Sequence, residues 1–500
     1  MEFARNGRSV VLGIAAAAAT ALLVWFGNGL HPLWPLMWVA PLPVLLYALR
    51  SDGSTWSAWL AAWLGWFAGC GNLLGYMRLL GSPVAAWATA FGLTALVFAA
   101  GVLLCRGLVR RGTVWSAVVA LPAVWVTFEY VRNLVWPHGS AGSLGYSQLN
   151  FLPFLQLASL TGPWGMSFVL LLFSSGLAVA WAVRRTEAGR ALRVAGATVG
   201  IGAAVLVFGA VRLSMRQTGP TVKVGLVTSD EIRGVADPEP RAQEIFTQYA
   251  EQAQALIARG ARVVVLPEDQ GVVVDPHVAE VDAIFQPIAD RTGAVLVVGV
   301  NHVSGAVKHN EARIYTRGAP VRSYDKEHLL PPFENIFTPG TARTVFPAPA
   351  GAGTLWGVAI CKDLDFMNPA RGYGREGVGL VMAPAWDFQV DAFWHGHIAV
   401  MRAVEDGFSL VRSARGGFMT VADDRGRIVG EARSNSAPFA TVLAEVPAGH
   451  DGTLYQVWGE WFAWCATALL AWVLVRRWTA KRPTTEDTKS TEREPVASSR

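Results

Sequence analysis

Cys361 stands where an apolar run gives way to charge, in the stretch GVAICKDLDF. A cysteine thiolate is a strong nucleophile when a base and a cation lie beside it. Glu268 ends the run VVVLPE, and Lys326 lies in YDKEHLLPPFE, so both also follow apolar segments. Glu268 would accept the thiol proton, and Lys326 would stabilise the thiolate and a developing oxyanion. We therefore expect the three side chains to meet and form an activated nucleophile.

Strand and helix patterns alternate from about residue 220 to 450, which is typical of a layered α/β domain. Helices are predicted at 239–259, 278–291 and 395–407. Strands are predicted at 221–229, 262–269, 294–303, 311–318, 321–330, 353–363 and 377–387. The segment 409–431 is predicted as two strands joined by the turn DDRG. Because polar residues at strand ends form sites in such folds, the three candidates are expected at one sheet edge.

The remainder of the chain is much more apolar, and the whole sequence of 500 residues has 52% hydrophobic and 16% charged residues. A helix needs about 20 apolar residues to cross a bilayer. We predict eight spans, at 9–27, 31–49, 56–78, 84–105, 114–132, 158–183, 192–213 and 458–476. This divides the chain into a transmembrane domain at 1–215, a catalytic domain at 216–450, a C-terminal transmembrane helix at 451–480 and a disordered polar tail at 481–500.

Basic residues fall in every second connection between the predicted spans. They are Arg5, Arg8, Arg50, Arg106, Arg110, Arg111, Arg184, Arg185, Arg190, Arg193, Arg476, Arg477, Lys481 and Arg482. With eight spans all of them lie on one side of the membrane, which the positive-inside rule makes cytoplasmic. The catalytic domain is therefore predicted on the extracytoplasmic side. The basic residues are used in these loops, so nucleic-acid binding is not expected.

The cysteines and histidines narrow the chemistry further. Cys70, Cys105 and Cys465 fall in predicted spans, which leaves Cys361 without a partner for a structural disulfide. The sequence has no CxxC motif and no clustered histidines, so a metal site is not expected.

The order Glu268, Lys326, Cys361 in these contexts resembles the nitrilase or carbon–nitrogen hydrolase superfamily. That resemblance implies an αββα sandwich and a thioester intermediate. It also implies no cofactor, because a thioester stores an acyl group without one. The segment MRAVEDG is similar to a helix with Arg and Glu that members of that superfamily carry below the site. The alternative is that Arg402 and Glu405 form an i, i+3 surface ion pair, and we expect both residues to be structural in either case.

The membrane layout resembles one branch of the superfamily, the apolipoprotein N-acyltransferase family. The stretch 143–173 is similar to the segment that enters the sixth span in that family. The lysine loop is also similar, and it places Glu334 eight residues beyond Lys326 as a second functional glutamate. Next to the nucleophile, Lys362 and Asp363 are near-site residues, and Lys362 adds a second cation beside the thiol.

The resemblance implies an acyl transfer in two steps at the bacterial cytoplasmic (inner) membrane. Cys361 would take a fatty acyl chain from a membrane phospholipid and pass it to the N-terminal amine of diacylglyceryl-cysteine on a lipoprotein. Glu334 would position Lys326 or relay a proton. The expected partners are therefore the phospholipid donor, the diacylated lipoprotein acceptor and the bilayer, and we expect a monomer.

Aromatic residues in loops near the candidate site suggest a lid that dips into the outer leaflet. They are Phe333, Phe337, Phe366, Trp386 and Trp394. The alternative is that these residues only pack or anchor the loops.

Two other functions remain open on the sequence. One is a membrane-bound amidase that uses the same triad with water or another amine as acceptor. The other is a transporter, which needs ionisable residues inside its spans. Glu129, with Arg132 beside it, is the main candidate for such a residue.

Overall fold

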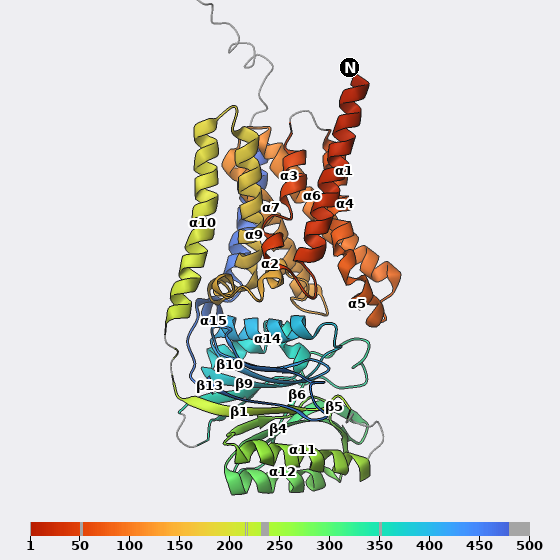
Figure 1. The fold of residues 1–500 in the computed structure, drawn as a ribbon, viewed down its shortest axis with the longest axis vertical. Coiled ribbons are helices and arrows are strands. Elements are labelled where there is room, and N and C mark those ends of the chain that lie inside the picture. Colours follow the sequence, from red (N-terminus) through yellow and green to blue (C-terminus); the bar gives the residue numbers. More distant parts are fainter. Residues whose placement is uncertain are drawn as a thin grey trace, which may run out of the picture.

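The computed structural model describes residues 2–50, 54–215, 217, 219–231, 240–349 and 353–479. A helical bundle and an α/β domain are stacked end to end (Figure 1). The tail at 481–500, predicted to be disordered, lies outside the described residues.

The bundle is formed by the first part of the chain and by its last helices. Its elements are α1 (Glu2–Gly27), α2 (Trp34–Met37), α3 (Leu42–Ala48), α4 (Thr55–Gly69), η1 (Cys70–Leu73), α5 (Leu74–Leu79), α6 (Val84–Val109), α7 (Val114–Val135), η2 (Leu144–Gln148), α8 (Leu152–Leu155), α9 (Ala158–Val183), α10 (Ala188–Ser214), α15 (Leu454–Trp458) and α16 (Trp461–Thr479). The rings of Trp66, Phe98 and Trp125 pack together inside it, with centroids 4.1 Å apart for Trp66 and Phe98. Such aromatic packing holds the helices at fixed distances.

Among the described residues, five helical segments are long and apolar enough to cross a membrane. They are Gly7–Gly27, Val84–Val109, Val114–Val135, Ala158–Val183 and Ala188–Ser214. The span predicted at 31–49 is instead the short helices α2 and α3, because prolines interrupt helical hydrogen bonding there. The span predicted at 56–78 is divided into α4, η1 and α5, and the last one corresponds to α16.

The α/β domain contains two open sheets. The first has the strand order β13-β1-β2-β4-β5-β6, with β3 beside β4, and the second has the order β12-β11-β10-β9-β8-β7. Their strands are β1 (Thr221–Thr228), β2 (Val263–Val265), β3 (Val272–Val274), β4 (Val295–Ser304), β5 (Val307–Tyr315), β6 (Arg322–Asp325), β7 (Thr344–Pro347), β8 (Leu355–Val358), β9 (Val378–Trp386), β10 (Ser409–Arg415), β11 (Phe418–Ala422), β12 (Ile428–Arg433) and β13 (Ala440–Pro447). Strands β1, β2 and β4 run parallel, as do β8, β9 and β10.

The two sheets face each other across a buried core that includes Leu226, Val265, Val358 and Met382. Helices α11 (Pro240–Ala258) and α12 (Val278–Thr292) cover the outer face of the first sheet. Helices α13 (Ala370–Arg375) and α14 (Ala392–Asp406) cover the second sheet, on the side of the bundle (Figure 1). The domain is therefore an αββα sandwich, as predicted.

Several strands are shorter than predicted, and this moves the candidate residues into loops. Strand β2 ends at Val265, β6 ends at Asp325, and β8 ends at Val358. Cys361 begins the 3-10 turn η3 (Cys361–Asp365). The segment predicted as two strands contains three, since β10 and β11 form a further hairpin before the predicted turn between β11 and β12.

Helix α14 is apolar on two faces because it lies between the sheet and the bundle. Ile398, Met401 and Val404 belong to the core of the bundle. Val400 and Ala403 belong to the core beneath the second sheet. A helix that is apolar all round must be covered on both sides.

The ion pair of Arg402 and Glu405 on α14 is fully buried. Arg402 Nη1 lies 2.9 Å from Glu405 Oε2, and both side chains are inaccessible to solvent. Arg402 Nη2 also donates to the hydroxyl of Tyr146 in η2 at 3.1 Å. The structure therefore excludes the surface alternative, which the sequence left open because it does not show that the bundle covers this helix.

We expect Arg402→Met to destabilise the protein by about 3–5 kcal/mol, because it leaves a buried carboxylate without its cation. The double variant Arg402→Met/Glu405→Leu should recover part of this loss. The measurement is the thermal unfolding of the detergent-solubilised full chain. A double variant that is no more stable than the single one would contradict a buried-charge origin.

Candidate active site

The loops after β2 and β6 bring two of the predicted residues together. Glu268 lies in the loop after β2, and its backbone N–H donates to the carbonyl oxygen of Ala385 in β9 at 3.4 Å. Lys326 directly follows β6, and its backbone N–H donates to the carbonyl oxygen of Asn310 in β5 at 2.9 Å. These backbone contacts fix the positions from which both side chains extend.

The Lys326 ammonium lies between two carboxylates. Its Nζ is 2.7 Å from Glu268 Oε1, 2.9 Å from Glu334 Oε1 and 2.8 Å from Glu334 Oε2. Burial alone would lower the pKa of Lys326, but the charges of Glu268 and Glu334 raise it well above its ordinary value. Lys326 therefore stays charged at neutral pH.

Glu268 is buried and sits in a mixed electrostatic environment. Burial raises the pKa of Glu268, the Lys326 ammonium lowers it, and the nearby carboxylate of Glu334 raises it. A glutamate with a raised pKa is better suited to accept a proton from a thiol and return it later.

Asn310 is a site residue that the sequence analysis missed. Its amide nitrogen donates to Glu268 Oε1 at 2.6 Å and to Glu334 Oε1 at 2.7 Å. The side chain is buried in the middle of β5. A buried polar residue within a strand needs partners, and that was the one available signal.

Cys361 adopts a backbone conformation that L-residues rarely occupy, with φ at +44°. The residue is half-buried, and its thiol donates to the carbonyl oxygen of Trp386 at 3.4 Å. Burial raises the pKa of the Cys361 thiol well above its ordinary value, Glu268 raises it further, and Lys326 lowers it. The thiol is thus within electrostatic range of both residues and needs a base to become a nucleophile.

Asp363 connects the cysteine turn to the lysine loop. Its carboxylate accepts hydrogen bonds from the backbone N–H of Ile360 at 2.9 Å and of His328 at 2.8 Å. It also accepts one from the Tyr324 hydroxyl at 2.8 Å. Through these hydrogen bonds, Asp363 fixes the loop of Cys361 relative to the loop of Lys326, and it is therefore a positioning residue.

Lys362 is also buried, and it contacts the bundle. Its Nζ lies 3.2 Å from His138 Nδ1, in the loop after α7, and 3.7 Å from Asp365 Oδ2. Burial lowers the pKa of Lys362, and the Asp365 carboxylate opposes that shift.

A second buried ion pair that the sequence analysis missed lies near Cys361. Arg412 in β10 contacts Asp387 through two hydrogen bonds, at 2.5 and 3.0 Å. Asp387 raises the pKa of the Cys361 thiol, and Arg412 lowers it. Arg412 lies in β10 and Asp387 directly follows β9, and a single sequence does not reveal that these two strands pair in parallel.

The five predicted lid residues separate into two groups. Phe333 and Trp386 are each 47% exposed. Phe337 is half-buried, and Phe366 stacks on His328 with ring centroids 3.7 Å apart. Trp394 lies on α14, half-buried against the core of the bundle. Two of the five residues are therefore well exposed, and the lid itself stays a prediction.

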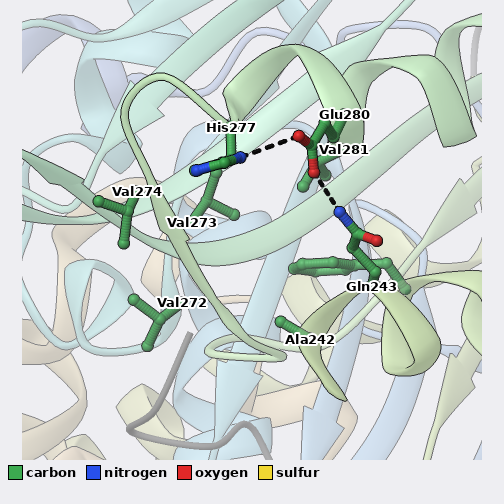
Figure 2. Close-up of a pocket in the computed structure, with 9 residues that line it drawn as sticks. Ala242, Gln243, Val272, Val273, Val274, His277, Glu280 and Val281 are labelled. Carbon is green, nitrogen blue, oxygen red and sulfur yellow. Dashed lines mark hydrogen bonds and ion pairs between the residues drawn. The ribbon is translucent and has the colours of Figure 1, made fainter. Parts of the chain in front are cut away.

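A surface hollow lies in another part of the domain, between α11, β3 and α12 (Figure 2). There Glu280 contacts His277 Nδ1 at 2.8 Å and also contacts Gln243. None of Glu268, Lys326 and Cys361 lines this hollow.

Glu129, the residue that pointed to a transporter, has a local role in the bundle. Its Oε1 accepts a hydrogen bond from the backbone N–H of Leu144 at 2.6 Å, at the start of η2. Glu129 therefore holds the segment after α7 against that helix. This structural role gives no separate support for a transporter.

Two family models match the chain in sequence. The model for the apolipoprotein N-acyltransferase N-terminal domain matches residues 20–176, and the model for carbon-nitrogen hydrolase matches residues 223–456. The chain belongs to the apolipoprotein N-acyltransferase family. Its catalytic domain is thus a membrane-associated member of the nitrilase superfamily.

Similar curated proteins extend over most of the chain. The apolipoprotein N-acyltransferase of Geobacter metallireducens is 26% identical over 482 residues, covering 87% of this chain and 89% of its own length. Those of Bradyrhizobium diazoefficiens and Rhizobium meliloti are 26% and 28% identical, covering 95% and 83% of this chain and 96% and 83% of their own lengths. Among solved structures, an amidase from Nesterenkonia sp. is 20% identical, covers 47% of this chain and 93% of its own, and has a TM-score of 0.40.

We expect the removal of the Asn310 amide to shift the pH dependence of acylation. Glu268 must be ionised to accept the thiol proton, so activity is lost as pH falls through the raised pKa of Glu268. Asn310→Ala removes a donor that favours the ionised form, so this acid limb should move to higher pH by about one unit.

The rate of acyl-enzyme formation against pH is the measurement for Asn310→Ala. Asn301 is the matched control, since it pairs with Asn310 across β4 and β5 but contacts Asp269. An equal shift in Asn301→Ala and Asn310→Ala would contradict the assigned contact.

Proposed function

We propose that this chain transfers a fatty acyl chain from a membrane phospholipid to the N-terminal amine of diacylglyceryl-cysteine on a lipoprotein. The family and the names of the similar curated proteins support this activity. The observation that carries the mechanism is the Lys326 ammonium, held between Glu268 and Glu334 within electrostatic range of Cys361.

In the first step, the Cys361 sulfur attacks the carbonyl carbon of the acyl ester while Glu268 takes the thiol proton. The tetrahedral oxyanion forms near the Lys326 ammonium, which stabilises it. The ester C–O bond then breaks, and the leaving lysophospholipid oxygen receives the proton from Glu268. An acyl-thioester remains on Cys361.

In the second step, the acceptor amine attacks the thioester carbonyl. Glu268 takes a proton from the attacking nitrogen, and Lys326 again faces the oxyanion. The C–S bond breaks, and the sulfur recovers a proton from Glu268. Glu334 keeps Lys326 oriented throughout, because both of its oxygens contact Nζ.

We further propose that the α/β domain, at 216–450, faces away from the cytoplasm at the bacterial inner membrane. α9 begins beside this domain, since Gln156 donates to the carbonyl oxygen of Arg425 at 2.8 Å. α10 ends beside the α/β domain, where Arg212 donates a hydrogen bond to the carbonyl oxygen of Asp424 at 3.4 Å. The connection between α9 and α10 therefore lies at the opposite end of the bundle (Figure 1). It carries Arg184 and Arg185, and Arg190 and Arg193 follow in the first two turns of α10, so the basic residues favour the cytoplasmic side for this end.

The two exposed aromatic residues suggest where the donor lipid arrives. Phe333 belongs to the lysine loop, and the carbonyl oxygen of Trp386 accepts the hydrogen bond from the Cys361 thiol. Moving an acyl chain into water costs about 0.8 kcal/mol for each CH₂ group, so apolar loops beside the thiol favour access from lipid. We propose that these loops contact the outer leaflet.

A thioester on Cys361 is the first expected result. Incubation of the full chain with phospholipid should add the mass of one acyl group to the peptide that contains Cys361, and Cys361→Ala should lack it. Addition of a diacylated lipopeptide should discharge the adduct onto the amine. Release of free fatty acid alone would instead favour the amidase alternative.

Phe333→Ser should raise the apparent KM for the phospholipid donor about tenfold with little change in kcat, because it removes an apolar contact of about 1.5 kcal/mol. Steady-state kinetics in mixed micelles measure both constants. Val307→Ser is the control, since Val307 is 42% exposed on another hairpin. Unchanged lipid kinetics in Phe333→Ser would remove the lid proposal.

A further inference from the structure

One loop of the bundle, residues 136–143 between α7 and η2, contacts both ends of the turn that carries Cys361. Near its start, Lys362 Nζ lies 3.2 Å from His138 Nδ1. At its end, the carbonyl oxygen of Asp365 accepts two hydrogen bonds from Ser140, from the backbone N–H at 3.2 Å and from Oγ at 2.6 Å. The turn η3 is therefore fastened to the bundle at two points.

The approach of this loop to the turn leaves no space for an extra atom. Gly139 has φ at +55°, and a Cβ on it would lie 2.9 Å from both the carbonyl oxygen of Asp365 and a ring carbon of Phe366. Contacts below about 3 Å between such atoms force one side to move. The loop and the turn thus have one relative position.

The charged groups around η3 lie beside partners that fit their protonation states. Burial alone would raise the pKa of Asp365, but His395 on α14, 3.1 Å away, holds it well below its ordinary value. Burial would likewise lower the pKa of His395, but Asp365 and Asp391 raise it to about 10. Burial and the Lys362 charge lower the pKa of His138 to about 4, so its neutral ring can accept a hydrogen bond from the ammonium.

We propose that His138, Gly139 and Ser140 form a positioning element that holds η3 so that the strained Cys361 presents its thiol to Glu268 and Lys326. The inference rests on the proposed role of Cys361 as the nucleophile. It adds that this reactivity depends on the bundle and not on the α/β domain alone.

The positive charge of Lys362 is one way in which the loop at 136–143 influences the Cys361 thiol. The Asp365 carboxylate, the His138 ring, the Lys326 ammonium and the Glu334 carboxylate all face Lys362, and the charge of Cys361 raises the pKa of this ammonium. Since such coupling is reciprocal, Lys362 favours the thiolate. The thiol is also faced by Glu268, Lys326, Asp387 and Arg412. Displacement of Lys362 therefore removes one cation from a site that keeps its carboxylates.

The first experiment compares two glycines of the same loop in the full chain in detergent. Gly142 also has a positive φ, at +78°, but a Cβ there would meet nothing closer than 3.6 Å. Gly139→Ala and Gly142→Ala therefore share the backbone cost and differ in the contact with η3. The readout is the rate at which iodoacetamide alkylates Cys361, followed by mass spectrometry of its peptide, with the Cys361→Ala protein as background control.

Gly139→Ala should slow the alkylation of Cys361 about tenfold or more, as expected for a misplaced reactive group. Gly142→Ala should stay within about twofold of the wild type, because its added methyl group has space.

The second experiment tests the polar contact by itself. His138→Ala should move the pH midpoint of Cys361 alkylation upward by about one unit, because Lys362 loses its partner. It should also lower kcat for acyl-enzyme formation without raising the KM for the lipid. His138→Asn should restore both values, since its Oδ1 can replace the accepting Nδ1.

The outcomes distinguish a failure of the proposed nucleophile, Cys361, from a failure of the proposed positioning by His138, Gly139 and Ser140. If the wild-type chain forms no acyl adduct on Cys361 from phospholipid, the proposed role as nucleophile fails. If the wild type forms the adduct and both Gly139→Ala and His138→Ala are alkylated like Gly142→Ala, only the positioning proposal is overturned. If Gly139→Ala does not fold, the pH midpoints of His138→Ala and His138→Asn decide, and equal midpoints overturn it.

Discussion

The buried ammonium of Lys326 is the interaction on which the site depends. An uncompensated charge in such a position would lose several kcal/mol of solvation, so it needs partners on fixed elements. Glu268 comes from the loop after β2, Glu334 from the lysine loop, and Asn310 from the middle of β5. The first sheet and its loops therefore assemble one compact group of charges whose geometry none of the three segments could maintain alone.

The nucleophile is held in a different way, by backbone contacts and not by direct bonds to the triad. Cys361 keeps an unfavourable φ because Asp363 ties the turn to the lysine loop and Ser140 ties it to the bundle. Strain of this kind lasts only where the surroundings determine the conformation on several sides. The second sheet brings the Asp387–Arg412 pair to the same place. The site is therefore composed at the junction of two sheets and a membrane bundle.

Much of the fold and part of the site followed from the sequence. Apolar runs that end in polar residues predicted the positions of Glu268, Lys326 and Cys361 near strand ends, and Glu334 was predicted from the resemblance of the lysine loop to that of the family. Asn310 and Arg412 were missed because their importance comes from pairing between strands that are distant in sequence. The pair Arg402–Glu405 was predicted, but its burial was not, since the i, i+3 spacing says nothing about what covers a helix. The continuous helix predicted at 31–49 is divided into α2 and α3, because hydropathy averages over prolines that break the helix.

The two apolar faces of α14 have a consequence for the α/β domain when it is separated from the bundle. Ile398 and Met401 pack in the core of the bundle, and Val400 packs in the core beneath the second sheet. Without the bundle, the first of these faces would be exposed to water, which is unfavourable in proportion to the apolar area. The isolated domain therefore needs detergent or another apolar surface over α14 to stay in solution.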